Sequence, residues 1–220
     1  MDSCPDLSAK LRITEIFHSL QGESTRVGLP TVFVRLTGCP LRCTWCDTTY
    51  SFTGGETTTV GAVVDQVKAF DCPTVCVTGG EPLAQKGCLP LLTALCDAGY
   101  SVSLETSGAL DIGEVDPRVS RIVDIKAPGS GEVERNLWSN LDKLNTHDEL
   151  KLVLASEADY LWARDILREK NLSKRCSVLI SPVQGALSPT TLAEWILRDR
   201  LPVRFQLQLH KVLWGSAQGK

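Results

Sequence analysis

The chain has 220 residues, of which 43% are hydrophobic, so it is long enough to bury a substantial core and does not have the composition of a disordered protein. Its 23 basic and 26 acidic residues give a formal net charge of −3, which argues against a nucleic-acid-binding protein. No apolar run reaches the roughly 20 residues needed to cross a bilayer, and the amino-terminal residues lack the apolar segment of a signal peptide, so we expect a cytoplasmic protein.

From residue 10 onward, short β-branched runs alternate with amphipathic segments of helical length, without linkers or repeats. The expected strands are residues 10–17, 31–36, 74–78, 101–105, 121–125, 149–154, 177–181 and 202–209. The expected helices are residues 59–70, 88–98, 133–141, 157–169 and 189–198, the last after the start signal Ser188-Pro189.

Alternating strands and helices predict a parallel sheet. About six such units predict an α/β fold of the open, partial TIM-type barrel kind, with an N-terminal extension. A doubly wound open sheet is the alternative. We expect a single domain over residues 1–220, with residues 1–10 flexible.

The loop after the strand at residues 31–36 carries three cysteines in a C-x3-C-x2-C pattern, Cys39, Cys43 and Cys46. A structural zinc site normally has a fourth Cys or His ligand, and none is nearby in the sequence. Three thiolates on a four-iron cluster leave one iron open to another ligand. The pattern favours a [4Fe-4S] cluster, with zinc or unligated thiols as the alternatives.

The other six cysteines have no compact ligand spacing, and an odd total of nine does not suit a secreted disulfide framework. An auxiliary cluster is one interpretation, but we expect most of them to be small buried hydrophobic residues. They are Cys4, Cys72, Cys76, Cys88, Cys96 and Cys176.

Polar residues end several of the predicted strands, at the edge where such folds bind ligands. Residues 77–82 (VTGGEP) combine paired glycines, which let backbone approach a ligand, with Glu81, which could accept from an ammonium group. Residues 105–108 (ETSG), 124–128 (DIKAP) and 181–184 (SPVQ) offer groups suited to a ribose, a carboxylate or an adenine. Each alone often caps a helix, but their repetition favours a binding site.

The cysteine pattern, with an aromatic residue just before its last cysteine, resembles that of the radical S-adenosylmethionine (SAM) superfamily. Further segments, in order along nearly the whole chain, are similar to those of the 7-carboxy-7-deazaguanine synthases. These segments are residues 15–23 (EIFHSLQGE), 28–30 (GLP), 33–39 (FVRLTGC), 46–48 (CDT), 105–108 (ETSG) and 208–211 (QLHK).

The resemblance implies a lyase that contracts the ring of 6-carboxy-5,6,7,8-tetrahydropterin to 7-carboxy-7-deazaguanine with release of ammonia, in queuosine biosynthesis. It implies that a reduced cluster cleaves SAM to a 5′-deoxyadenosyl radical, and that Mg²⁺ assists. No catalytic residue is expected beyond this cofactor-bound radical. An electron donor such as flavodoxin and a homodimer are further expectations. A glycyl-radical-enzyme activase and a non-catalytic zinc-binding module are the rival functions.

The resemblance also assigns site residues. The cluster ligands would be Cys39, Cys43 and Cys46. The SAM contacts would be Trp45, Cys46, Asp47, Gly80, Glu81, Ser107, Asp124, Ile125, Lys126, Ser181, Pro182, Val183 and Gln184. The pterin contacts would be Leu20, Gln21, Gly22, Glu23, Arg35, Thr78 and His210, and the magnesium ligand would be Thr48.

Two of these roles agree with elementary chemistry. Arg35 would offer a planar fork to the substrate carboxylate. Thr48 would offer a hard oxygen to Mg²⁺, which also takes carboxylate and water. Two departures from the family pattern are Ser24, where a glycine is common, and the unfamiliar terminus at residues 212–215 (VLWG).

Overall fold

The structure, a computed structural model, describes residues 4–215 and 217–220. It contains a curved nine-stranded sheet with the order β3-β1-β2-β4-β5-β6-β7-β8-β9. The strands are β1 (Lys10–Leu20), β2 (Pro30–Leu36), β3 (Glu56–Thr59), β4 (Thr74–Gly79), β5 (Ser101–Thr106), β6 (Ser120–Asp124), β7 (Glu149–Leu154), β8 (Ser177–Pro182) and β9 (Arg204–Phe205).

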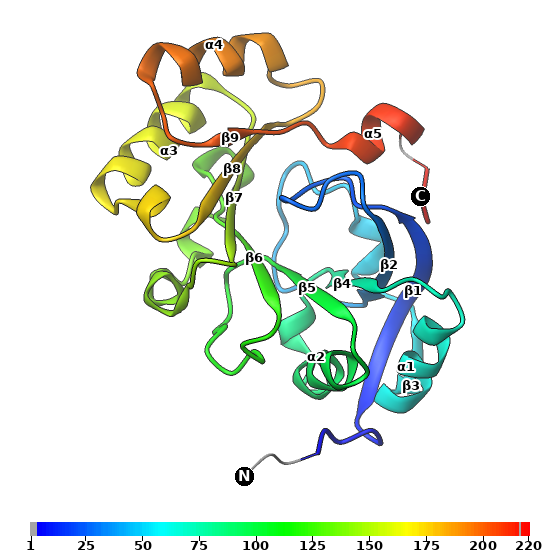
Figure 1. The fold of residues 1–220 in the computed structure, drawn as a ribbon. Helices are drawn as coiled ribbons and strands as arrows, with labels where there is room; N and C mark the ends of the chain where they lie inside the picture. Colours follow the sequence, from blue (N-terminus) through cyan, green and yellow to red (C-terminus); the bar gives the residue numbers. More distant parts are fainter. Residues whose placement is uncertain (1–3, 216) are drawn as a thin grey trace.

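Strands β2 and β4 to β9 run parallel to one another, whereas β1 is antiparallel to its two neighbours, β2 and β3. Within the described residues, the outermost strands β3 and β9 do not pair, so the sheet stays open (Figure 1). The parallel strands follow one another in chain order, as in a TIM-type barrel and unlike the reversed order of a doubly wound sheet. The predicted open, partial barrel is confirmed.

Helices α1 to α4 pack on the outer face of this sheet (Figure 1). The helices are α1 (Val60–Lys68), α2 (Cys88–Asp97), α3 (Glu157–Glu169), α4 (Pro189–Asp199) and α5 (Leu209–Trp214). Short 3-10 helices are η1 (Thr49–Ser51), η2 (Pro82–Ala84), η3 (Pro128–Ser130), η4 (Val133–Arg135), η5 (Trp138–Lys143) and η6 (Leu172–Lys174). No helix in these parts of the chain is both long and apolar enough to span a membrane.

Side chains alternate between the two faces of the sheet, as the period of two in a strand requires. On β4, Val75 and Val77 pack into the core under the helices, whereas Thr78 lines a cavity on the inner face. On β5, Leu104 belongs to the core and Glu105 lines the cavity. The sheet therefore separates an apolar outer core from a polar inner face.

Two predicted elements were wrong. The helix expected at residues 133–141 is two 3-10 turns, η4 and η5, separated at Asn136, whose ψ of 116° is extended. The side-chain amide of Asn136 accepts from Lys126 N at 2.8 Å through Oδ1 and donates to Lys126 O at 2.9 Å through Nδ2. Leu137 N donates to Gly108 O at 3.0 Å. These bonds tie the segment to the loops after β5 and β6 and prevent a continuous helix.

The strand expected at residues 202–209 shrinks to the two residues of β9. Beyond it the chain leaves the sheet and runs toward β1 and β2, where α5 lies (Figure 1). Of the amino-terminal residues expected to be flexible, residues 1–3 lie outside the described ones. Leu7 O and Ala9 O accept hydrogen bonds from Gly61 N and Val60 N, which dock this segment on the start of α1.

Candidate active site

A cavity of about 430 Å³ opens on the inner face of the sheet. Residues far apart in the chain meet in its wall, because parallel strands deliver their carboxyl ends to one edge. The expected site residues that line it are Leu20, Gln21, Gly22, Glu23, Arg35, Cys39, Cys43, Trp45, Cys46, Asp47, Thr48, Thr78, Gly80, Ser107, Asp124, Lys126, Val183, Gln184 and His210.

Four expected SAM contacts lie outside this lining, namely Glu81, Ile125, Ser181 and Pro182. The Glu81 carboxylate is fully buried and accepts from Ser107 N at 2.7 Å, from the Ser107 and Thr106 hydroxyls, and from Leu83 N at 3.0 Å. The hydrogen-bond acceptors of the Glu81 carboxylate are thus satisfied by groups of the protein itself. The contact of Glu81 with the amino group of SAM stays a prediction.

The glycines beside Glu81 allow the end of β4 to approach the cysteine loop. Glu81 N donates to Gly38 O at 2.8 Å. A Cβ atom on Gly80 would lie 2.3 Å from Gly38 O and 2.7 Å from the Cys39 Cβ, so only glycine fits there. The paired glycines thus allow the cysteine loop to pack closely. Both also line the cavity, and their approach to a ligand stays a prediction.

The three motif cysteines are free and partly exposed in the cavity wall. Burial raises the pKa of the Cys39 and Cys43 thiols, and the Lys126 ammonium partly opposes this by favouring the thiolates. Within the described residues, no three His, Cys, Asp or Glu side chains gather as one metal ion would require. In a four-iron cube each thiolate binds a different iron, so the free thiols and the nearby cation fit such a group.

Ser181 adds an independent observation on the same side of the sheet. Its hydroxyl is buried and has no hydrogen-bond partner among the described residues. It is paired in register with Val153, which lines the cavity. Because buried polar groups are normally hydrogen-bonded, this hydroxyl suits a polar ligand in the adjoining space.

Arg35 lies at the inner face of β2, where two aromatic rings and a carboxylate orient it. Its guanidinium carbon is 5.8 Å from the Phe17 ring centroid and 5.9 Å from that of Tyr50. Its Nε donates to Glu15 Oε1 at 2.7 Å, and the Tyr50 hydroxyl donates to the same oxygen at 2.8 Å. Burial and Glu15 raise the pKa of Tyr50 to about 12 against the opposing Arg35 charge, so this hydroxyl keeps its proton.

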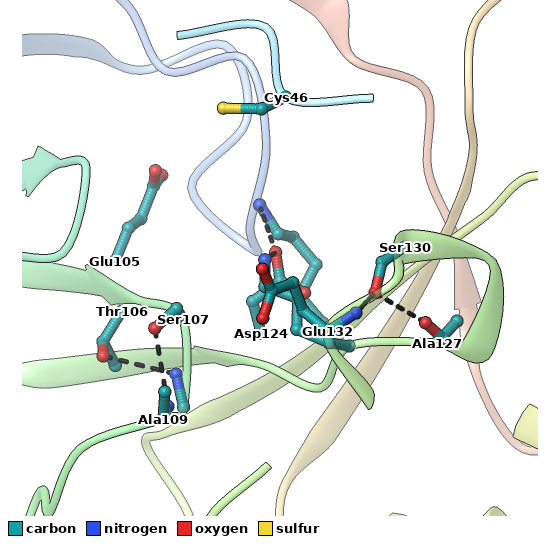
Figure 2. A network of polar contacts seen from close by, with 12 residues as sticks. Cys46, Glu105, Thr106, Ser107, Ala109, Asp124, Ala127, Ser130 and Glu132 are labelled. Atoms are coloured by element: carbon teal, nitrogen blue, oxygen red, sulfur yellow. Dashed lines mark hydrogen bonds and ion pairs between the residues drawn. The ribbon is translucent and has the colours of Figure 1, made fainter. Parts of the chain in front are cut away.

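Of the charged residues in the wall, Lys151 was not expected from the sequence, and Glu105 was expected only as part of the segment at residues 105–108. Glu105 accepts from the Thr78 hydroxyl at 3.1 Å and from Gln21 Nε2 at 3.3 Å. Figure 2 shows Glu105 and Asp124 extending from β5 and β6 toward the side where Cys46 lies. Lys151 joins them from β7. The detectable signal for Lys151 was a basic residue between Leu150 and Leu152, which belong to the core on the other face of the strand.

The carboxy-terminal segment closes one side of the cavity against the loop of residues 20–24. Leu209 N donates to Gly22 O at 2.9 Å, and a Cβ on Gly22 would lie 2.2 Å from His210 Nδ1. Lys211 Nζ lies 2.7 Å from Asp47 Oδ2, next to the last motif cysteine. The contacts of this tail, which the sequence left open, are thus to the predicted substrate loop and to the cysteine loop.

Ser24 has a positive φ of 67°, the left-handed conformation that glycine adopts most easily. The Gln206 amide holds it there, because its Oε1 accepts from Ser24 N at 2.9 Å and its Nε2 donates to Ser24 O at 2.7 Å. This geometry explains why a glycine suits the position and how a serine is accommodated.

Comparison with known proteins agrees with this geometry. The family model described as the Radical SAM superfamily matches residues 33–125. A 7-carboxy-7-deazaguanine synthase of Chlorobaculum tepidum is 53% identical, covering 94% of this chain and 96% of the relative. One of Koribacter versatilis is 42% identical, covering 93% and 97%. The crystal structure of QueE from Escherichia coli matches with a TM-score of 0.75 and 25% identity over 91% of this chain and 95% of that one.

Proposed function

Because the chain belongs to the 7-carboxy-7-deazaguanine synthase family of radical SAM enzymes, we propose that its cavity holds 6-carboxy-5,6,7,8-tetrahydropterin beside SAM. As a member, it is a lyase of queuosine biosynthesis with a [4Fe-4S] cluster and SAM as cofactors. The observation that carries the proposal is that one cavity joins the three motif cysteines to the loop of residues 20–24 and to Arg35.

When bound, the cluster and SAM supply the one-electron radical chemistry. Cys39, Cys43 and Cys46 would hold the cluster. The polar groups at the ends of β5, β6 and β8 would bind and orient SAM, and Lys126 would balance the negative charge of the thiolates. The carboxy-terminal segment would exclude water, since it covers the cavity between Gly22 and Asp47.

The pterin would lie against β1, β2 and the loop of residues 20–24. Arg35 would bind the substrate carboxylate through its terminal nitrogens, because its Nε already donates to Glu15. Gln21 and Glu23 would contact the pyrimidine edge, and Thr78 and His210 would complete the wall. Held in this way, the substrate has a single orientation toward the radical.

The proposal extends to partners and location. A low-potential electron donor such as flavodoxin would reduce the cluster. The protein would act in the cytoplasm as a homodimer, and α5 offers apolar surface for contacts, with Val212 64% and Leu213 48% exposed. Neither a nucleic acid nor a membrane is among the proposed partners, in keeping with the net charge of −3.

The magnesium site would use Thr48, whose side chain faces the cavity with its hydroxyl 3.7 Å from the Cys46 sulfur. Replacing Thr48 by valine removes the oxygen and keeps the volume. We expect formation of 7-carboxy-7-deazaguanine to lose most of its stimulation by Mg²⁺, with iron content unchanged. The measurement is product formed from the carboxytetrahydropterin over a titration of Mg²⁺, without oxygen.

The matched control is Thr53→Val, at an exposed threonine after the same turn, which should respond to Mg²⁺ like the parent. An undiminished magnesium response in Thr48→Val would assign Thr48 to the turn alone. The same assay tests the function, because a parent protein that forms no product from this pterin contradicts it.

A further inference from the structure

Lys151 occupies the middle of β7 on the inner face of the sheet, and its side chain is only 12% exposed. Its Nζ lies 2.5 Å from Glu23 Oε2 and 3.6 Å from Asp124 Oδ2. A buried ammonium group is costly unless it is paired, so these carboxylates fix where the lysine points. Lys151 thus connects the loop of residues 20–24 to the end of β6.

Building on the proposed function, we propose that Lys151 is a positioning residue for the pterin. It holds the Glu23 carboxylate in the cavity wall so that this carboxylate accepts hydrogen bonds from the N–H groups of the pyrimidine edge.

The Glu23 carboxylate has the capacity for this role. Its Oε1 accepts from Gln208 Nε2 at 2.5 Å, and its Oε2 accepts from Lys151. A carboxylate has about four lone-pair positions, so each oxygen keeps one for a ligand. The 2-amino group and the adjacent ring N–H of a pterin are two parallel donors that match these two oxygens. Glu23 is 6% exposed and lines the cavity, so a bound ligand would meet it without competing water.

The charges around the pair keep Glu23 ionised. Burial raises the pKa of Glu23, but the Lys151 charge and hydrogen bond, with Gln208 and His210, lower it to about 2. Lys151 itself faces Glu23, Asp124 and Glu105. Burial opposes its charge, but these carboxylates hold the pKa of Lys151 well above its usual value. At neutral pH, Glu23 therefore acts only as an acceptor, as two N–H donors require.

Without the Lys151 charge, burial would become the main influence on the pKa of Glu23. The pKa of Glu23 would then rise, and a protonated carboxyl would present a donor to the donors of the pterin. Lys151→Met keeps a similar length without the charge, whereas Lys151→Arg keeps the charge. Lys68→Met, at an exposed residue at the end of α1, is the matched control.

The test is anaerobic equilibrium binding of 6-carboxypterin, which lacks the air sensitivity of the substrate, to the reconstituted enzyme with SAM. We expect Lys151→Met to bind about tenfold or more weakly, and more weakly still as the pH falls from about 8 to about 5. Lys151→Arg should recover most of the affinity, and Lys68→Met should match the parent. Affinity in Lys151→Met equal to the parent at every pH would overturn the inference.

A second comparison separates this role from a general structural one. If Lys151 acts through Glu23, the variant E23Q/K151M should bind 6-carboxypterin within about twofold of E23Q alone. This pair also serves if K151M alone does not fold, since the double variant leaves no unpaired Glu23 charge. A further tenfold loss in the double variant would overturn the inference. A parent enzyme that does not bind 6-carboxypterin would instead contradict the proposed function.

Discussion

Replacing Cys43 by alanine is expected to remove nearly all cluster iron and all measurable SAM cleavage. Cys43 lies with Cys39 and Cys46 in the wall of one cavity. A cluster held by only three protein thiolates is not stably bound when one of them is removed. Iron and sulfide analysis after anaerobic reconstitution measures this effect. The parent should hold about four irons per chain and little zinc.

The matched control is Cys96→Ala, at a partly buried cysteine on α2 that does not line the cavity. It should keep the iron content and SAM cleavage of the parent. Full iron retention with activity in Cys43→Ala would refute the cluster assignment. A parent protein that binds one zinc and no iron would instead favour the zinc-binding module.

Replacing Arg35 by lysine should lower the affinity for the pterin by about tenfold to a hundredfold. Lysine keeps the charge but loses the planar fork, which the Phe17 and Tyr50 rings orient and which Glu15 holds through Nε. Hydrogen bonds to charged groups contribute about 1.5 to 3 kcal/mol, which gives this range. The measurement is anaerobic equilibrium binding of the carboxytetrahydropterin.

Cluster content and SAM binding should stay close to those of the parent in this variant, because the hydrogen bond and ring contacts of Arg35 are with Glu15, Phe17 and Tyr50, none of which is an expected cluster ligand or SAM contact. The control is Arg12→Lys, the same substitution at an exposed residue of the neighbouring strand β1. Unchanged pterin affinity in Arg35→Lys, with an intact cluster, would mean that Arg35 is structural and that the carboxylate binds elsewhere.

Most of the fold could be predicted because its elements have clear periodicity. The strand at residues 149–154 and the helix at residues 157–169 match the structure at both ends. Elements whose backbone is fixed by distant residues could not be predicted. Asn136 interrupts a helical pattern through bonds to Lys126, and the strand at β9 ends where the Gln206 side chain binds Ser24. Both side chains add tertiary hydrogen bonds to distant segments, which the local sequence does not reveal.

Site residues that belong to a sequence motif could be predicted. Residues that reach the cavity only because of their register in a strand were harder to predict. The cysteine loop, Arg35 and the loop of residues 20–24 all reach the cavity. Glu81 does not, because the groups that satisfy its carboxylate, Thr106 and Ser107, come from the next strand. Lys151 was missed because it lies within a strand and outside every motif, and Glu105 was expected only as part of the segment at residues 105–108. Only the sheet shows that both face inward.

The most direct test of the family function is the mass of the product formed without oxygen. The reconstituted protein is incubated with SAM, a strong reductant, Mg²⁺ and 6-carboxy-5,6,7,8-tetrahydropterin. We predict 7-carboxy-7-deazaguanine and ammonia in equal amounts, both absent when SAM or the pterin is omitted. SAM cleavage with no change in the mass of the pterin would contradict this function.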